Sequence, residues 1–484
     1  MTRRHRLAVI GVGVLGLLAL PGSAAFARPP GPPPRTVFEG PLPRAQCGPG
    51  SSPETGLQGQ VPRADRESGR SSQGYSCNLD LVGRYGPSDG FEGAEWQMTW
   101  YDHCAYYDTR YLGTQQRRGT VVVDVSDPAR PRYSTNLTTG AMIDPWESLK
   151  VNEARGLLAG VFVADAQGAA FFDVYDVKGD CAHPKLLASV PVNGLGHEGG
   201  WAPDGKTYYG TGINSLVTAI DVADPAAPKP ITAFSVPSAI HGLGVSDDGR
   251  RLYLAHMNPD VATSFVDGRA NSTAGNGLGI HDVSEIQSRQ PRPQVRLVGT
   301  ALWTDGQAGQ HAIPFTSGGH PYVVFVDELS QGGARIIDIA DERRPRVLTK
   351  LKTEIQMPEN LDTANRDTRR PPKENNGLIP GTFGYDAHYC SIDRPVDPTI
   401  VACSEFQSGL RVFDIRDVRH PREIAYFNPG GDGRVLPGSF GGTYAGYTSA
   451  QPRIIPERGE IWFTDQDRGF YAVRFANGVW PFVP

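Results

Sequence analysis

The sequence lacks the features that mark nucleic-acid-binding proteins and several common enzyme classes. Its 484 residues carry a formal net charge of only -5, and the basic residues are dispersed rather than clustered. We therefore expect no nucleic-acid partner, because such proteins concentrate lysine and arginine on one surface. Neither the zinc-protease string H-E-x-x-H nor the serine-hydrolase string G-x-S-x-G occurs. No reaction class has a recognisable signature here.

Long hydrophobic runs are absent beyond the N-terminus. Residues 1–27 begin MTRRHR, continue through LAVIGVGVLGLLAL and end in Ala25-Phe26-Ala27, which is the order of a secretory signal peptide. We expect cleavage after Ala27 and a secreted or cell-envelope exterior location. The string GVGVLG in this segment matches the dinucleotide pattern G-x-G-x-x-G, but no strand precedes it and cleavage would remove it. We expect no membrane span after the signal is removed.

Cysteine is scarce, and its six residues form no C-x-x-C pair. In an exported chain this pattern favours disulfides over a zinc cage. Cys390 and Cys403 flank the turn at 393–398 nearly symmetrically, so we expect them to face each other across a hairpin and to pair. Fifteen pairings are possible for six cysteines. For the others we expect Cys47 with Cys77 and Cys104 with Cys181.

The N-terminal part after the signal has little apolar periodicity. Residues 28–46 contain PPGPPP, which is too rich in proline for a sheet and predicts an extended linker. Residues 47–77 are polar, and we expect the Cys47–Cys77 disulfide to tie them into a loop. The remaining residues, 78–484, carry the repeated patterns and are expected to form one domain.

One phrase recurs along this domain. It reads VVVDVSDPARPR from residue 121, TAIDVADPAAPK from 218, RIIDIADERRPR from 335 and RVFDIRDVRHPR from 411. Each copy has an aspartate seven residues before a proline, which predicts a β-strand, an Asp/Pro turn and a second strand. We interpret the aspartates as structural turn residues. They are Asp124, Asp221, Asp338 and Asp414.

The repeats predict the fold. Another hairpin precedes each copy, so each unit contains four short strands, and looser copies at 174–185 and 280–293 and the strand 469–475 bring the units to seven. The predicted fold is all-β, a seven-bladed β-propeller of four-stranded antiparallel blades. Residues 78–83 resemble an outer strand but precede the first blade, so we expect this N-terminal strand to close the ring beside 469–475.

The strands VVVDVSDP, RIIDIADE and RVFDIRD resemble the LVIVD repeat of secreted bacterial and archaeal proteins. The resemblance covers residues 78–476 and implies a propeller. It implies no active-site residue, because the family has no general catalytic assignment.

The long insertions at 257–277, 353–383 and 429–446 all fall on one face of the predicted propeller. Insertions concentrated on one face of a repeat protein mark its binding face. Four histidines occupy matching positions where the first strand of consecutive blades begins at this face. They are His197, His241, His311 and His388.

Further polar residues stand where the second strands return to the same face. These are Asp165, His256, Glu328, Glu405 and Asp465, with Glu198 and Asp386 beside two of the histidines. Imidazole and carboxylate groups that converge on a polar channel suit a divalent metal ion or a small polar ligand. The candidate ligand-binding residues are His197, His241, His256, His311, His388, Glu198, Glu328, Asp386 and Glu405. The candidate metal ligands among them are His197, His241, His256, His311 and Glu328.

His241 and His256 lie symmetrically about the turn at Asp248-Gly249. In a regular hairpin they face each other, close enough for their rings to interact. Two neighbouring imidazoles cannot both carry a charge cheaply, so we expect this pair to be neutral at pH 7, the form that binds metals.

Two functions remain open at this stage. The first is an exported propeller, expected to be a monomer, that binds an extracellular protein or a small polar ligand at this mouth without chemistry. The second is a metal-dependent hydrolase or oxidase with its site at the same mouth. The histidines also have a structural explanation as strand-bridging hydrogen-bonding residues copied by duplication. The nearby aromatic residues Trp146, Trp303, Tyr385 and Tyr444 could stack on a sugar or another ring, but we favour their packing of the loops.

Overall fold

The computed structural model describes residues 40–86, 97–108, 119–162, 170–192, 196–212, 214–258, 275–329, 332–367, 383–431, 446–466 and 468–482. The predicted signal peptide, residues 28–39 of the linker and residues 259–274, 368–382 and 432–445 of the three long insertions lie outside these residues. The chain divides into one unit of residues 1–36 and another of residues 37–484, and everything below belongs to the second unit. None of the helices in the described part has the length and apolar character needed to cross a bilayer.

The described residues form an all-β protein of six antiparallel sheets in a propeller arrangement. The first two sheets in the chain have four strands each. One contains β3 (Met98–Tyr101), β4 (Cys104–Tyr107), β5 (Thr120–Asp124) and β6 (Arg132–Leu137). The other contains β7 (Lys150–Asn152), β8 (Leu157–Val161), β9 (Ala170–Asp176) and β10 (Lys185–Val192).

The third sheet has seven strands because one long strand belongs to two neighbouring hairpins. Its strands are β11 (Glu198–Trp201), β12 (Thr207–Thr211), β13 (Asn214–Asp221), β14 (Lys229–Val245), β15 (Arg251–His256), β16 (Asn276–Asp282) and β17 (Arg296–Trp303). The ladder between β13 and β14 runs to Ser235, with one further pair at Ile240, where the ladder between β14 and β15 begins.

The last three sheets again have four or five strands. The fourth contains β18 (Gly309–Ser317), β19 (His320–Asp327), β20 (Gly333–Asp338) and β21 (Arg346–Leu351). The fifth contains β22 (Tyr389–Ile392), β23 (Ile400–Ser404), β24 (Leu410–Asp414), β25 (Arg422–Asn428) and the N-terminal β1 (Tyr75–Cys77). The sixth contains β26 (Arg453–Ile455), β27 (Glu460–Asp465), β28 (Gly469–Phe475) and β2 (Leu79–Tyr85).

The repeated phrase forms the third and fourth strands of its sheet, as the sequence predicts. In all four copies the aspartate side chain accepts a hydrogen bond from the backbone N–H two residues later, at 2.8–3.2 Å. This Asx turn redirects the chain into the next strand. The structural interpretation of Asp124, Asp221, Asp338 and Asp414 is therefore confirmed.

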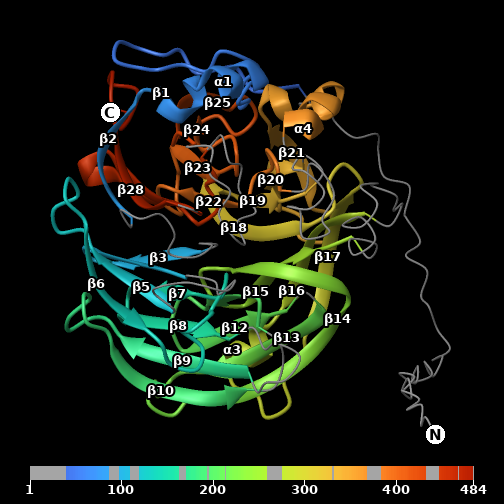
Figure 1. The fold of residues 1–484 in the computed structure, drawn as a ribbon. Coiled ribbons are helices and arrows are strands. Elements are labelled where there is room, and N and C mark those ends of the chain that lie inside the picture. Colours follow the sequence, from blue (N-terminus) through green and yellow to red (C-terminus); the bar gives the residue numbers. More distant parts are fainter. Residues whose placement is uncertain are drawn as a thin grey trace, which may run out of the picture. The chain divides into compact units, whose positions relative to one another are not determined.

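The predicted pairing of the N-terminal strand is confirmed. β2 runs antiparallel to β28, with Leu79 opposite Phe475 and Tyr85 opposite Phe470. Figure 1 shows β2, in blue, beside the red β28, so the two ends of the domain share one sheet. This pairing covers the edge of β28 that would otherwise be open to another chain.

Short helices occur outside the sheets. They are α1 (Arg63–Ser68), η1 (Arg70–Gln73), α3 (Ser284–Gln287), η2 (Glu354–Gln356), η3 (Pro358–Asn360), α4 (Leu361–Asp367) and η4 (Pro456–Arg458). The segment that contains α1 and η1 ends in β1, which pairs with β25. Leu42, within the predicted linker, is buried among residues of the fourth and fifth sheets, so the linker ends before this residue.

All three predicted disulfides are confirmed. Cys47 pairs with Cys77, and Cys104 pairs with Cys181. Cys390 and Cys403 stand directly opposite each other in β22 and β23, with Cα atoms 4.0 Å apart. Three disulfides fit a protein from an oxidising, extracellular environment.

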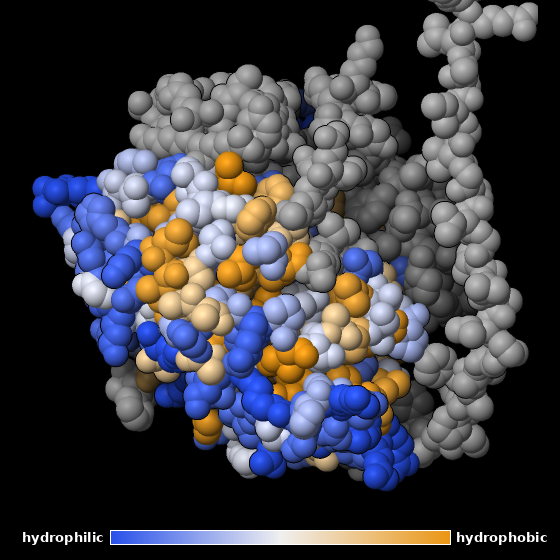
Figure 2. All heavy atoms as spheres, turned by 90° about the horizontal axis from the view of Figure 1, so that it is seen from below, coloured by the Kyte–Doolittle hydropathy of each residue, from blue (hydrophilic) through white to orange (hydrophobic). Residues whose placement is uncertain are grey.

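The apolar core lies between neighbouring sheets. One cluster joins Val122 of the first sheet to Leu158 of the second, and another joins Ile400 of the fifth sheet to Val473 of the sixth. The first strands of successive units, from β3 to β26, also contact one another in chain order. On the face in Figure 2, hydrophilic residues form much of the outer edge and apolar residues lie in groups between them. The packing thus brings the beginnings of the first strands together.

Candidate functional site: a buried histidine and glutamate centre

The histidine positions follow from the hairpins that begin each unit. His197, His241 and His311 each stand eight residues before a turn glycine with positive φ. Because glycine adopts this conformation without strain, these turns fix the register of the inner hairpins. The glycines are Gly205, Gly249 and Gly319. His388 directly precedes β22, and all four histidines are buried.

Three of these histidines converge on one carboxylate, that of Glu147. Oε2 of Glu147 lies 3.2 Å from Nε2 of His197 and 3.5 Å from Nε2 of His241. Its Oε1 lies 3.0 Å from Nε2 of His388. The Nε2 atoms of His197 and His241 are themselves 3.0 Å apart. The Nε2 atoms of all three imidazole rings therefore point to the Glu147 carboxylate.

A second carboxylate, that of Glu328, completes the cluster. Its Oε1 lies 3.6 Å from Nε2 of His241, and its Oε2 lies 3.4 Å from Nε2 of His388. We call Glu147, His197, His241, Glu328 and His388 the His/Glu centre. Its members come from four sheets, because Glu147 precedes β7, His197 precedes β11 and Glu328 follows β19.

The electrostatics of the centre favour positive charge beside Glu147. Burial raises the pKa of the Glu147 carboxyl, but the charges of His241, His197 and His388 outweigh burial and hold its pKa well below the usual range. Burial opposes charge on His388 as well, yet Glu147 and Glu328 raise the pKa of this imidazole to about 10. At His197 burial dominates and lowers the pKa.

Neighbouring groups orient the ligand atoms. Nδ1 of His388 lies 2.7 Å from the Ser449 carbonyl oxygen, so it donates there and Nε2 faces the centre. The Gln310 side-chain nitrogen lies 3.1 Å from Oε2 of Glu147 and 3.2 Å from Nε2 of His388. Nδ1 of His241 faces Oε2 of Glu198 at 3.8 Å.

A second set of buried polar side chains adjoins His241. We call Lys150, Glu198, His311 and Tyr389 the Glu198 group. Oε1 of Glu198 lies 3.9 Å from Nζ of Lys150 and 4.0 Å from Nδ1 of His311. Among the described residues, no group lies within 3.5 Å in hydrogen-bonding geometry of either Glu198 oxygen or of the Tyr389 hydroxyl. Separations of this size between buried polar groups suit a bridging water or a small polar ligand.

Aromatic side chains enclose the centre. The Trp146 ring lies 4.9 Å from that of His197, and the Phe406 ring lies 4.9 Å from that of His388. Phe383 and Tyr447 pack on Phe406. Trp146, Phe383 and Phe406 all have positive φ, at 48°, 54° and 34°. Bulky residues rarely adopt this conformation, and such strain is concentrated at functional sites.

The donor set fits a divalent transition metal ion. In a tetrahedral zinc site with bonds of about 2.0–2.1 Å, neighbouring ligand atoms are about 3.3 Å apart. The contacts within the His/Glu centre are 3.0–3.6 Å long. The ligand atoms of Glu147, His197 and His241 all lie within 4.8 Å of one another. A metal ion that binds the imidazoles takes the place of their protons, so the imidazoles are then neutral. The three carboxylates of Glu147, Glu198 and Glu328 and the one ammonium group of Lys150 then sum to a formal charge of −2, which a divalent cation would balance.

The predicted pair of His241 and His256 is wrong. A bulge between Ile240 and Leu243 adds one residue to β14, so His256 stands opposite Ile240. The ring of His256 contacts Ser238 and lies 5.8 Å from that of His281. His256 therefore lies outside the His/Glu centre, and burial lowers its pKa to about 3.

Other predicted residues are distributed between the centre and its surroundings. His197, His241, Glu328 and His388 belong to the centre, whereas Glu198 and His311 belong to the adjacent group. Glu405 accepts a hydrogen bond from Gln356, and Asp465 accepts one from the Tyr447 backbone. Asp386 is buried, and its charge helps to raise the pKa of Glu405. Asp165 and Tyr444 lie outside the described residues.

Two of the predicted aromatic residues serve packing. The Trp303 indole donates to Asp327, and Arg335 lies over its ring. The Tyr385 hydroxyl contacts the Val61 backbone. Trp146, by contrast, contacts a member of the centre.

Sequence reasoning missed Glu147, which contacts three histidines. It stands nine residues before Gly156, the turn glycine of its hairpin, whereas the histidines stand eight residues before theirs. Its backbone bridge to Glu198 aligns it with the next unit. One signal was available in the sequence. Glu147 is an acidic residue at the start of an inner hairpin, and the other inner hairpins between residues 119 and 329 have a histidine at this place.

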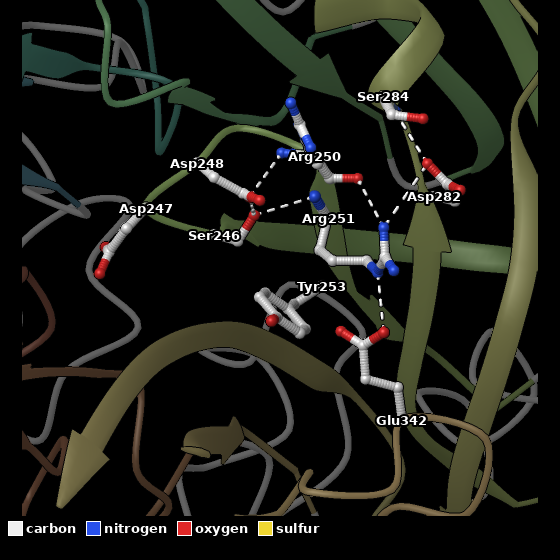
Figure 3. A pocket seen from close by; sticks show the side chains of 9 residues that line it. All are labelled: Ser246, Asp247, Asp248, Arg250, Arg251, Tyr253, Asp282, Ser284 and Glu342. Carbon is white, nitrogen blue, oxygen red and sulfur yellow. Dashed lines mark hydrogen bonds and ion pairs between the residues drawn. The ribbon is translucent and has the colours of Figure 1, made fainter. Parts of the chain in front are cut away.

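A cavity of about 560 Å³ on the surface is a weaker candidate. Figure 3 shows Arg251 there between Asp282 and Glu342, while Ser246 donates to Asp248. These charged and polar groups satisfy one another. The cavity therefore offers less for a ligand than the His/Glu centre.

No protein-family model matches this chain, and no curated protein sequence is significantly similar to it. The functional argument consequently rests on the geometry of the His/Glu centre.

Proposed function

We propose that this chain is an exported β-propeller that binds a divalent first-row transition metal ion in the His/Glu centre. The observation that carries the proposal is the convergence of three Nε2 atoms, from His197, His241 and His388, on the carboxylate of Glu147 in a buried site. Imidazole and carboxylate ligands suit zinc, iron, cobalt, nickel or copper. Glu328 supplies a further carboxylate.

We also propose that the six sheets form seven propeller blades. Five sheets supply one blade each, and the seven-stranded sheet supplies two that share β14. Pro237 lies between the two parts of β14 and has no N–H for a ladder. An apolar cluster that includes Val217 and Leu252 packs between the two halves of this sheet, like the clusters between separate sheets. This packing supports two blades.

We further propose that the protein is exported. The N-terminal sequence pattern and the resemblance of the repeated phrase to the LVIVD repeat support it. The three disulfides agree with an oxidising compartment.

The test compares two buried histidines of the same hairpin. We expect purified, untagged wild-type protein to bind close to one equivalent of Zn²⁺ or Co²⁺ in calorimetric titration. His241→Ala should lose this binding, because His241 contacts Glu147 and Glu328. His256→Ala is the matched control, because it removes a buried imidazole outside the centre. Equal binding by both variants, or a wild type that binds neither ion, would refute the proposal.

Catalysis at the same centre is a second candidate function. The observation that favours it is the Glu198 group beside His241, in which the buried polar atoms of Glu198 and Tyr389 have no hydrogen-bond partner among the described residues. Such groups could transfer a proton or hold a substrate hydroxyl in a metal-dependent hydrolase or oxidase. Glu198→Gln separates the two functions. Retained metal with lost turnover of activated esters or phosphoesters supports hydrolysis, and no turnover by the metal-loaded wild type argues against hydrolysis.

A further inference from the structure

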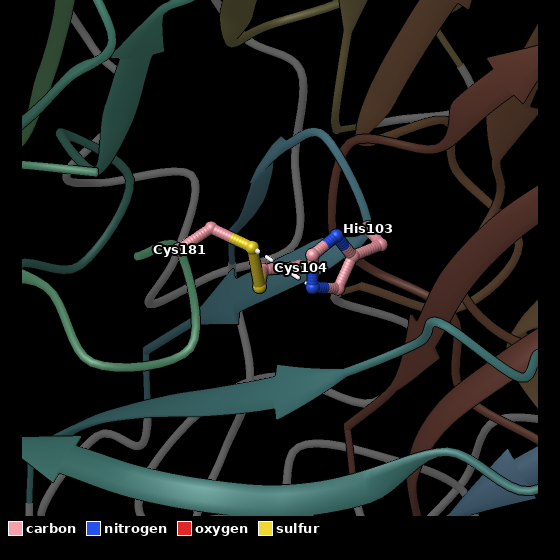
Figure 4. A group of neighbouring side chains, drawn as sticks. All are labelled: His103, Cys104 and Cys181. Atoms are coloured by element: carbon pink, nitrogen blue, oxygen red, sulfur yellow. Dashed lines mark hydrogen bonds between the residues drawn. A yellow bond between two sulfur atoms is a disulfide. The ribbon is translucent and has the colours of Figure 1, made fainter. Parts of the chain in front are cut away.

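The turn between β3 and β4 places a histidine against a disulfide. His103 precedes Cys104, the first residue of β4, and Cys181 lies in the loop between β9 and β10. Nε2 of His103 is 3.5 Å from Sγ of Cys181. Figure 4 shows the imidazole edge facing the two sulfur atoms.

Asp102 fixes the orientation of this ring. Its Oδ2 lies 2.9 Å from Nδ1 of His103, so Nδ1 donates to the carboxylate and Nε2 faces the disulfide. Histidines that bind metals commonly have this second contact between their other nitrogen and a carboxylate. The carboxylate contact thus prepares Nε2 of His103 to act as a ligand.

The four nearby donor atoms form a recognisable set. Sγ of Cys104, Sγ of Cys181 and Nε2 of His103 all lie within 4.8 Å of one another. Oδ1 of Asp124 lies 3.9 Å from Nε2 of His103. Two thiolates, one imidazole and a fourth oxygen ligand form a common zinc coordination. The sulfur atoms are joined in the disulfide and bind zinc as thiolates only after reduction.

Among the described residues, neither of the other disulfides has this arrangement. Cys390 and Cys403 face each other across β22 and β23, and Sγ of Cys47 approaches the Tyr426 hydroxyl at 3.8 Å. A histidine at the sulfur atoms therefore distinguishes the Cys104–Cys181 disulfide.

We propose that reduction of the Cys104–Cys181 disulfide converts it into a zinc site formed by Cys104, Cys181 and His103, with Asp124 beside it. A dithiol reductant supplies two electrons and two protons, so the S–S bond breaks, two thiols form and the reductant becomes a disulfide. Zn²⁺ then displaces both thiol protons and binds the two thiolates and Nε2 of His103. The zinc site and the disulfide exclude each other, so zinc stabilises the reduced protein.

This proposal does not depend on the proposed function, because the two sites have different ligand atoms. The His/Glu centre contains nitrogen and oxygen donors alone. A bound Co²⁺ ion therefore gives thiolate-to-cobalt charge-transfer absorption at the cysteine site and none at the His/Glu centre.

The experiment uses full-length protein reduced with a phosphine and desalted without oxygen. We expect titration with Co²⁺, carried to two equivalents so that the His/Glu centre is also filled, to produce the thiolate band, and Zn²⁺ to displace the band and to protect Cys104 and Cys181 from iodoacetamide in peptide mapping. His103→Ala should weaken binding by at least 10-fold. His183→Ala is the matched control, because His183 pairs with Asp180 in the same loop without contacting a sulfur atom.

Asp102→Asn is a second variant that keeps all of the metal ligands and removes the carboxylate charge. It should weaken Co²⁺ binding even if His103→Ala does not fold. The proposal is overturned if the folded, reduced wild type gives no thiolate band. It is equally overturned if the band and its Co²⁺ dependence are the same in wild type and in either folded variant, or if zinc protects other cysteines instead.

Discussion

At the scale of single residues, Glu147 is the carboxylate that connects the His/Glu centre. The Glu147 carboxylate oxygens lie within 3.5 Å of nitrogen atoms of His197, His241, His388 and the Gln310 amide. We expect Glu147→Gln to lower the affinity for Zn²⁺ on the order of 100-fold or more, because it removes the charged ligand that contacts three of the histidines.

Calorimetric titration would measure this loss. Glu153→Gln is the control, because Glu153 lies six residues away and contacts the half-buried Trp100 indole. If Glu153→Gln lowered affinity as much as Glu147→Gln, the effect would come from general charge and not from coordination.

Gly242 makes room for Glu198. A Cβ atom at this position would lie 1.4 Å from Oε2 of Glu198 and 2.3 Å from the Gln310 backbone oxygen. Gly242→Ala should therefore displace the Glu198 carboxylate and destabilise the protein by about 1–3 kcal/mol. Urea unfolding would measure this, with Gly179→Ala as the control, since a Cβ there meets nothing within 4 Å. Equal stability of the two variants would contradict the close packing around Glu198.

Glu405 predicts a pH dependence of stability. Burial raises its pKa from 4.5 to about 8. Between these values the folded state binds more protons than the unfolded state, so the contribution is fully present below pH 4.5 and is lost as pH rises through 8. Glu405→Gln should flatten this part of the stability profile, by up to about 1.4 kcal/mol per pH unit.

Melting temperatures measured from pH 5 to 9 would check this prediction. The control is Glu67→Gln, an exposed residue of α1. An unchanged slope in Glu405→Gln would mean that this carboxyl does not titrate in the predicted range.

The candidate site was partly predictable from single residues. Histidines that recur eight residues before a turn glycine identified His197, His241 and His311, and His388 was identified from its place at the start of the next inner hairpin. Glu147 was not predictable in the same way, because it stands one position away from theirs. The error at His256 has a specific cause. One extra residue in β14 shifts the register, and a shift of one residue turns side chains to the opposite face.

At the scale of elements, the disulfides connect strands over different chain lengths. Cys104–Cys181 spans 77 residues and joins the first two sheets, whereas Cys390–Cys403 spans 13 residues within one hairpin. The loss of loop-closure entropy in the unfolded chain gives a stabilisation of about 4.5 kcal/mol for the longer loop and about 3 kcal/mol for the shorter one. Replacing Cys104 and Cys181 by alanine should therefore destabilise the protein more.

Denaturant unfolding of the two double variants, both without added metal, would test the order. A larger loss on removal of Cys390 and Cys403 would mean that local strain or packing outweighs chain entropy at these sites.

The repeated phrase made the strands predictable because its Asx turn is a local interaction. The pairing of β2 with β28 was predictable from a surplus strand at one end and a missing partner at the other. The single long β14 was not predictable, because Pro230 and Pro237 both interrupt its sequence pattern. Likewise, nothing local indicated that Leu42 packs on the fourth and fifth sheets.

At the scale of the whole molecule, the His/Glu centre ties together four sheets. A metal ion that binds the folded state alone stabilises it by about 2.7 kcal/mol at 100 times its dissociation constant. We expect the melting temperature of the wild type to rise with Zn²⁺ concentration and that of His241→Ala to stay constant. Calorimetric scans would measure both. A similar rise in His241→Ala would place the stabilising metal elsewhere.

The sharing of the last sheet by the two ends of the domain has a consequence for biosynthesis. β2 emerges early from the ribosome, but its partner β28 emerges almost 400 residues later. During that interval the ring cannot close, and β2 remains an unpaired edge that a second nascent chain could join. Completion of the domain is thus coupled to the arrival of its last residues, and a chain that stops before Gly469 should aggregate rather than fold.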